Sequence, residues 1–141
     1  MYINPIPPSA AKSFNAWEVV VLYVASLFKY SFHKYASNVV ERCLTFGNEK
    51  QVKEIISEII ELDQNNPEYI ISMVKDRFAN YVIQKMIEHS DNYDKQLLIK
   101  IILNKQGKIK NDGFSRHVLN YIEKVIGRNI NNNKYKQGNY Y

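Results

Sequence analysis

Two short segments of this chain carry polar side chains at matching positions, four residues apart. In the first segment Ser37 precedes Glu41, and in the second Asn80 precedes Gln84. Residues four apart lie one turn apart on the same face of a helix, so each pair can hydrogen-bond together to one flat polar edge of a ligand. An ionised carboxylate only accepts hydrogen bonds, whereas a side-chain amide both donates and accepts them. The two pairs therefore suit different ligand edges.

Both pairs belong to a longer repeated segment. Residues 34–44 read KYASNVVERCL and residues 77–87 read RFANYVIQKMI, an offset of 43 residues. Basic, aromatic, alanine and branched apolar positions agree between the copies, and the polar differences fall at three positions: Ser37/Asn80, Asn38/Tyr81 and Glu41/Gln84. A shared scaffold with variable polar positions is expected of a repeat protein whose units each recognise a different ligand element.

A third, weaker copy follows at residues 114–122, which read FSRHVLNYI, 36 residues after the second. This period is typical of helical solenoids. The extra length of the first interval is expected in a loop at the polar stretch 61–69, because insertions are tolerated between helices. The third copy has Arg116, His117 and Asn120 at its polar positions. A degenerate last repeat is expected as the terminal cap of a stack.

Composition sets only broad limits. With 141 residues, 45% of them hydrophobic, the chain can bury one core. The net charge of +5 is compatible with a polyanionic partner, although many ordinary domains are as basic. The single cysteine, Cys43, excludes an intramolecular disulfide framework and fits a reducing compartment, so the expected location is cytoplasmic. Cys43 occupies the register position of Met86 and is interpreted as a small buried core residue.

The periodicity predicts helices throughout and no convincing strand. The clearest is the amphipathic helix at 49–62, whose apolar residues recur at helical spacing. Residues 1–26 are interpreted as a Pro-rich leader and an N-terminal helix, and the Asn-rich residues 127–141 as a disordered tail. The apolar run 19–28 is too short to span a bilayer and is interpreted as a buried helix rather than a targeting segment. Helices are expected at about 14–32, 37–44, 49–62, 67–74, 80–88, 94–103 and 115–126.

The two copies resemble the last two repeats of a Pumilio-family (PUF) RNA-binding domain. Repeats of that family carry two polar recognition residues four apart, with a stacking residue beside the first. The family's penultimate repeat resembles SNxxE and its last resembles NYxxQ, which is the order found here. The stretch MVKDRFANYVIQKMI and the following FSRHVL also resemble the family's C-terminal end. The resemblance covers residues 27–126, and the upstream repeats of a complete family domain are absent from the sequence.

The resemblance implies an all-α, right-handed helical-repeat solenoid (an α-α superhelix), here a fragment with two RNA-binding repeats and a cap. It implies binding of single-stranded mRNA, in 3′ untranslated regions, to control translation or decay, with regulatory proteins as further partners. The RNA runs antiparallel to the repeats in this family, which implies 5′-U-G-3′ with uracil on the second unit. The implied RNA-binding residues are Ser37, Asn38, Glu41, Asn80, Tyr81 and Gln84.

Those residue types suit the implied bases. The two neighbouring donors of a guanine edge match the carboxylate of Glu41, and the mixed edge of uracil matches the amides of Asn80 and Gln84. Tyr81 offers a flat stacking face. The competing interpretation is that polar residues near helix starts, such as Ser37 and Asn80, serve only as helix caps or as a solvated face.

Other function classes have less support. The three histidines have no metal-ligand spacing, the five glycines form no phosphate loop, and the counterpart of Glu41 is a glutamine, which cannot act as a general base. No enzyme, cofactor, metal or membrane partner is expected. The alternative is an armadillo- or HEAT-like module that binds a protein. A first unit without a preceding neighbour also leaves an apolar face. Either this face is covered within the chain or it meets the same face of a second copy, and the residues expected to fill the gap are Trp17, Val20, Val21, Val24 and Leu27.

Overall fold

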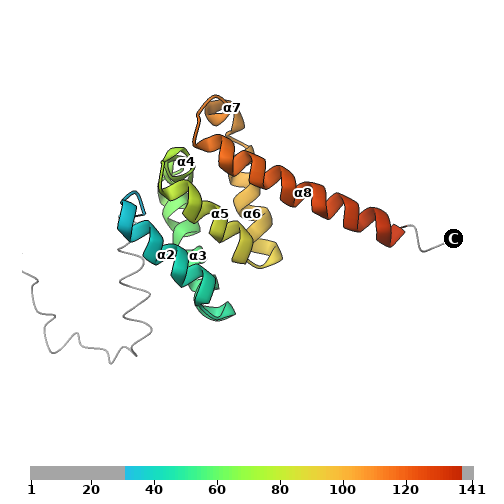
Figure 1. Cartoon of the computed structure of the whole chain (residues 1–141), viewed down its shortest axis with the longest axis horizontal. Coiled ribbons are helices and arrows are strands. Elements are labelled where there is room, and N and C mark those ends of the chain that lie inside the picture. Colours follow the sequence, from blue (N-terminus) through green and yellow to red (C-terminus); the bar gives the residue numbers. More distant parts are fainter. Residues whose placement is uncertain (1–30, 138–141) are drawn as a thin grey trace, which may run out of the picture.

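The computed structural model describes residues 31–137, which form helices joined by short connections (Figure 1). No strand occurs between these residues, and the predicted all-α fold is confirmed. The expected helix at 14–32 and the apolar run at 19–28 lie outside the described residues, except for residues 31 and 32, which form a turn. The helices are α2 (Lys34–Phe46), α3 (Glu49–Asn65), α4 (Tyr69–Lys75), α5 (Ala79–His89), α6 (Asn92–Leu103), α7 (Gln106–Ile109) and α8 (Ser115–Gln137).

The two repeat offsets in the sequence, 43 and 36 residues, also separate the starts of equivalent helices. Helix α3 begins at Glu49 and α6 begins at Asn92, 43 residues later. Helix α5 begins at Ala79 and α8 begins at Ser115, 36 residues later. These two pairs of helices therefore start at matching register positions, whereas α2 begins at Lys34, two residues before the position that matches Ala79.

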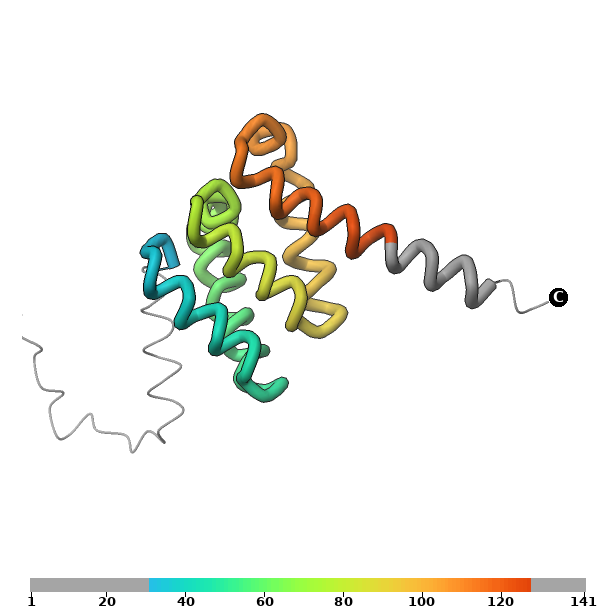
Figure 2. The backbone as a smooth tube through the Cα atoms, viewed as in Figure 1, coloured from blue at the N-terminus to red at the C-terminus, as the bar shows by residue number. Residues whose placement is uncertain are grey.

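The helices form two layers. Helices α2, α5 and α8 follow one another side by side, and α3 and α6 pack behind them (Figures 1 and 2). The short helices α4 and α7 lead into α5 and α8. Apolar side chains fill the space between the layers, and burying each large one stabilises the fold by roughly 1.5–3 kcal/mol. Fully buried members of this core include Leu44, Ile56, Ile59, Met73, Ile83, Met86, Leu98, Ile102 and Ile122.

The helices that carry the repeated polar residues are capped from equivalent positions. The Asp76 carboxylate accepts hydrogen bonds from the backbone N–H groups of Phe78 and Ala79, both at 2.8 Å. Asp112 accepts from the backbone N–H of Ser115, also at 2.8 Å. In the first unit His33 takes this place, and its Nδ1 accepts from the backbone N–H of Tyr35 at 3.3 Å. These acceptors satisfy donors that a helix start leaves free.

The outer layer is joined across units by a charged contact. Lys53 of α3 lies 2.6 Å from a carboxylate oxygen of Asp91 and 3.4 Å from one of Asp94. Asp91 is also the N-cap of α6, accepting from the backbone N–H of Asp94 at 2.8 Å. The hydrogen bond from the Asp94 backbone and the Lys53 ammonium lower the pKa of Asp91.

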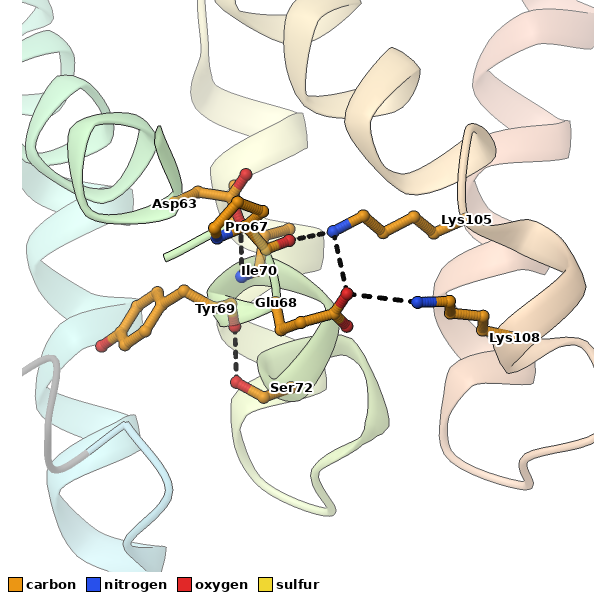
Figure 3. Close-up of polar contacts among 8 residues, drawn as sticks. All are labelled: Asp63, Pro67, Glu68, Tyr69, Ile70, Ser72, Lys105 and Lys108. Carbon is orange, nitrogen blue, oxygen red and sulfur yellow. Dashed lines mark hydrogen bonds and ion pairs between the residues drawn. The ribbon is translucent and has the colours of Figure 1, made fainter. Parts of the chain in front are cut away.

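The connection after α3 differs from the expected long loop at residues 61–69. Helix α3 continues to Asn65, and residues 66–68 alone link it to α4. The reason lies in Asp63, whose buried carboxylate accepts a hydrogen bond from the backbone N–H of Ile70 at 2.9 Å (Figure 3). This bond ties the end of α3 to the start of α4, so most of the extra length is helical.

The same connection contacts the third unit through lysines. Lys105 donates to the backbone carbonyl of Pro67, and its ammonium lies 3.4 Å from the carboxylate of Glu68 (Figure 3). Lys108 lies 3.2 Å from the same carboxylate. The hydrogen bonds from Lys108 and Lys105 lower the pKa of Glu68. The cluster joins the loop before α4 to the segment around α7.

Two further expectations differ from the structure. Helix α8 runs to Gln137, although composition favours a disordered tail from residue 127. No proline interrupts this stretch, so nothing in it forces the helix to stop at residue 126. Cys43 is half-buried rather than buried, whereas its counterpart Met86 is fully buried. The difference arises because Met86 lies between two units and Cys43 lies on the outer face of the first.

None of the helices in the described part of the chain combines the length and hydropathy needed to cross a bilayer.

Candidate nucleic-acid interface

Each copy of the repeated segment carries one recognition triplet, which is Ser37, Asn38 and Glu41 in the first copy and Asn80, Tyr81 and Gln84 in the second. The first residue of each triplet is buried. Ser37 exposes 3% of its surface and Asn80 exposes none. The hydroxyl of Ser37 donates to the backbone carbonyl of Lys34 at 3.1 Å, and the amide of Asn80 donates through Nδ2 to the backbone carbonyl of Asp76 at 2.7 Å. Neither side chain caps its helix, so the capping interpretation of these two residues is wrong.

The last residue of each triplet is partly exposed. Glu41 on α2 and Gln84 on α5 are both half-buried. Gln84 donates through Nε2 to Oδ1 of Asn80 at 3.3 Å, so the two amides of the second triplet contact each other. Burial raises the pKa of Glu41 above its ordinary value of 4.5, and the nearby ammonium of Lys85 on α5 offsets part of this rise.

The middle residue of each triplet is the most accessible. Asn38 is exposed, and Tyr81 exposes 47% of its surface. The ring of Tyr81 stacks against His117 of α8, with centroids 6.3 Å apart and planes inclined by 27°. A flat group that is half-open to solvent and oriented by a second ring is suited to stacking on a nucleobase.

Both triplets therefore have the same sequence of environments: buried, exposed, half-buried. The two helices that carry them, α2 and α5, pack against each other in the same layer. Side chains at equivalent positions of successive units face the same side of the stack, so the structure brings the two predicted triplets onto one surface. Such a surface can offer two adjacent base-sized positions.

The third unit also contributes to this surface, although the third copy lacks the polar pattern of the other two. A cavity of about 230 Å³ opens beside Tyr81 and Gln84, and α8 forms its other wall. His117 and Asn120 occupy the register positions of Tyr81 and Gln84, so the third copy does place polar groups at this surface. That register, visible at residues 114–122, was the available signal. The lining residues from α8 are His117, Asn120, Tyr121 and Lys124.

Basic and aromatic residues accompany each triplet at the start of its helix. The Arg77 guanidinium lies 4.6 Å from the centre of the Phe78 ring, and the Lys34 ammonium lies 5.7 Å from that of Tyr35. Both are within the distance range of cation–π contacts. These cations stay at the surface near the triplets, where they can attract phosphate groups. Among residues 31–137, no group of three or more His, Cys, Asp or Glu side chains is placed to hold a metal ion.

Comparison with known proteins agrees with this arrangement. The profile of the Pumilio-family RNA binding repeat matches residues 27–60 and again residues 69–103. The chain carries Pumilio-family repeats. The first matched Pumilio-family repeat includes α2 and most of α3, and the second includes α4, α5 and α6. Each match therefore contains one complete recognition triplet.

Relatives and a solved structure support the same conclusion. The chain is 37% identical over 117 residues to the mRNA-binding protein PUF3 of Saccharomyces cerevisiae, an alignment that covers 77% of this chain and 13% of that protein. It is also 37% identical over 64 residues to Pumilio homolog 1 of Arabidopsis thaliana, covering 45% of this chain and 6% of that protein. The chain thus spans a small part of the length of these relatives.

The crystal structure of PUF-8 in complex with PBE-RNA superposes on the fold with a TM-score of 0.69 and 29% identity. The match covers 78% of this chain and 32% of the PUF-8 chain. The stack of helices described above is therefore the repeat architecture of a Pumilio-family protein.

Proposed function

We propose that this chain binds single-stranded RNA sequence-specifically, as part of a protein that regulates mRNA after transcription. The observation that carries the proposal is the pair of triplets on α2 and α5, which share one pattern of burial and lie on two helices that pack against each other. The mRNA-binding relative and the RNA complex of the structural neighbour support it. A face that binds protein would not need a stacking residue between two hydrogen-bonding residues in each unit.

The first unit recognises guanine. Glu41 presents a half-buried carboxylate, and guanine offers two neighbouring N–H donors on its Watson–Crick edge. Charge-assisted hydrogen bonds are stronger than neutral ones, and partial desolvation at Glu41 strengthens them further. Ser37 lies beneath this position and Asn38 offers a planar amide beside the base.

The second unit recognises uracil. Gln84 offers both an acceptor and a donor to the mixed edge of uracil, and Tyr81 supplies the stacking surface. With the RNA antiparallel to the repeats, as the family resemblance implies, the element bound is 5′-U-G-3′. Surface cations near the triplets, including Lys34, Arg77 and Lys85, attract the backbone, so affinity falls as salt rises.

We further propose that the RNA partner is mRNA, bound in 3′ untranslated regions in the cytoplasm, and that regulatory proteins act with the chain. Because the chain spans only 13% of the yeast relative, additional repeats in a longer array would extend the recognised sequence.

A competition assay tests the proposal. A labelled five-nucleotide RNA with UG at its centre is displaced by unlabelled RNAs that carry UG, GU or CC there, at fixed salt. We expect the UG competitor to be the strongest by about tenfold, since one mismatched contact costs roughly 1–3 kcal/mol. Equal displacement by all three would show that binding is electrostatic and not sequence-specific, and would refute the proposal.

A further inference from the structure

The repeat register pairs a threonine in the first unit with a glutamate in the second. Thr45 and Glu88 are 43 residues apart, and each is the second-last residue of its helix, α2 and α5 respectively. We propose that Thr45 is a phosphorylation site for a protein kinase that recognises arginine, and that its phosphate pairs with Arg42 and weakens RNA binding. The weakening rests on the proposed RNA binding, whereas the modification itself does not.

The second unit already contains the charge pair that phosphorylation would create in the first. The ammonium of Lys85 lies 3.0 Å from the carboxylate of Glu88, three residues later on α5. The equivalent residues of α2 are Arg42 and Thr45, so the first unit has the cation of this pair and a hydroxyl in place of the carboxylate. A negative group near the end of a helix is unfavourable by itself, and a cation one turn before it offsets this cost. A phosphate on Thr45 would have such a cation in Arg42.

The hydroxyl of Thr45 is accessible. The residue is exposed, and its Oγ1 donates to the backbone carbonyl of Glu41 at 2.8 Å, a bond within its own helix. Only Phe46 follows it in α2, and that side chain is 80% exposed. Gly47 is already extended, and its N–H donates to the backbone carbonyl of Cys43 at 3.0 Å. Opening this last turn would present Thr45 to a kinase, and helix ends open locally at low cost.

The sequence around Thr45 suits a kinase with an acidic substrate groove. Thr45 is the only threonine of the chain, and among its serines and threonines it alone has an arginine three residues before it. Kinases select substrates partly by such charge patterns. In the transfer, Oγ1 of Thr45 forms a bond to the γ-phosphorus of MgATP while the bond from that phosphorus to ADP breaks. The hydroxyl proton is released, and no group is oxidised or reduced.

The phosphate would lie beside the proposed RNA-binding surface. Thr45 is one helical turn after Glu41, so the two side chains share one face of α2. Thr45 also holds the register position of Lys124, which lines the cavity beside Gln84. A phosphate adds about two negative charges at this position and engages the guanidinium of Arg42, which is otherwise free to attract RNA phosphates. Both effects weaken the binding of a polyanion.

The first experiment is independent of RNA. The 141-residue chain is incubated with MgATP and a purified kinase that requires arginine three residues before its target, and phosphothreonine is located by mass spectrometry. We expect phosphate on Thr45 in the parent, at least about tenfold less in Arg42→Gln, and none at this position in Thr45→Val. No phosphothreonine in the folded parent would overturn the inference. A peptide of residues 39–49, treated in parallel, shows whether the sequence or the fold prevents the reaction.

Pairing of the phosphate with Arg42 is measured by ³¹P NMR of the phosphorylated chain. A guanidinium beside the phosphate favours its doubly charged form, so we expect the second phosphate pKa to fall below its ordinary value of about 6. Substitution Arg42→Gln should restore the ordinary value. A phosphate that titrates identically in both chains would contradict the pairing.

The last experiment measures the effect on RNA. Phosphorylated chain, unmodified parent and Thr45→Val are titrated with the same UG-containing RNA at low and high salt. We expect phosphorylation to weaken binding about tenfold at low salt and less at high salt, because the effect is electrostatic, and Thr45→Val to bind like the parent. Equal affinity of the phosphorylated and unmodified chains would overturn the inference. An unmodified parent that binds no RNA would instead refute the proposed function, and the kinase assay would still decide the site.

Discussion

The rings of Tyr81 and His117 face each other across the boundary between the second and third units, with centroids 6.3 Å apart. The two residues occupy equivalent positions in their units, 36 residues apart in the sequence. Successive units therefore place their stacking groups opposite one another, and the third unit contributes to the surface as well as closing the stack. A base bound by Gln84 would stack on Tyr81 at this boundary.

Substitution Tyr81→Ala tests the stacking role. We expect RNA binding to weaken by roughly 1–3 kcal/mol with little change in base preference, because every base has a face to stack on. Tyr93→Ala, on the exposed part of α6, is the control, since that side chain is 74% exposed and belongs to the other layer. Binding as tight as the parent's at fixed salt would exclude Tyr81 from the interface. A parallel loss of thermal stability would make it a structural residue instead.

A double substitution tests base identity in the first unit. Ser37→Asn with Glu41→Gln installs the residues of the second triplet at the equivalent positions, in a full-length protein context. We expect the preference at that base to shift from guanine toward uracil, because an amide replaces the carboxylate that matches the two guanine donors. Competition binding with RNAs that vary only that base measures the shift. A retained guanine preference would refute the assignment of Glu41.

Base recognition by Glu41 should depend on pH. Its pKa is raised by burial, so the carboxyl takes up a proton at a higher pH than an ordinary glutamate does. Guanine preference should fall as the pH is lowered through that raised value, beginning above pH 4.5, since the protonated group loses acceptor capacity. Glu41→Gln should show a flat profile over the same range. If the guanine preference of the parent is equally independent of pH, the Glu41 carboxylate does not recognise the base.

Ionisation of Glu41 should also lower the stability of the fold at neutral pH. Because the folded-state pKa of Glu41 lies above its unfolded value, the ionised side chain costs stability once the pH rises through the folded pKa, and the cost is absent below the unfolded pKa. Glu41→Gln should therefore raise the melting temperature at neutral pH relative to the parent, and the difference should vanish in acid. A difference that grows in acid would contradict this sign.

The outer face of the first unit carries exposed apolar side chains. Val39 is 49% exposed and Phe46 is 80% exposed, whereas Val82, the counterpart of Val39 in the second unit, is fully buried against its neighbour. Exposed apolar patches of this kind favour association. We predict a concentration-dependent dimer in light scattering that Phe46→Ser weakens and Tyr93→Ser leaves intact. A chain that stays monomeric at all concentrations would contradict this prediction.

Sequence patterns predicted the units well because they reflect local periodicity. The starts of α3, α5, α6 and α8 follow from the two repeat offsets and the apolar spacing within each copy. The burial of a side chain that depends on packing against a neighbouring helix could not be predicted from these patterns. Asn80 is a polar residue in a recognition motif, yet packing buries it beneath Gln84. Cys43 shares the register of Met86, yet no described helix covers it as α2 covers α5.

The end of α3 illustrates the same limit. A polar stretch with Asn66 and Pro67 is typical of a loop, and composition alone does not show that Asp63 is held by the backbone of Ile70. That contact joins two segments seven residues apart and continues the helix through Asn65. Likewise the caps of the recognition helices, Asp76 and His33, precede the repeated motif and were not identified by comparing the two copies.

NMR mapping of the 141-residue chain can show, residue by residue, whether the surface formed by α2 and α5 binds the dinucleotide 5′-U-G-3′, as we propose. Two bases contribute roughly 1–3 kcal/mol each, and the cost of ordering a flexible RNA strand offsets most of this gain. We therefore predict a dissociation constant in the high-micromolar range at physiological salt. Titration with a UG-containing RNA should shift the signals of Asn38, Glu41, Tyr81 and Gln84 and leave those of the exposed residues of α3 and α6 unchanged. Shifts confined to α3 and α6, or the same shifts with an RNA that carries GU, would refute specific binding of UG at this surface.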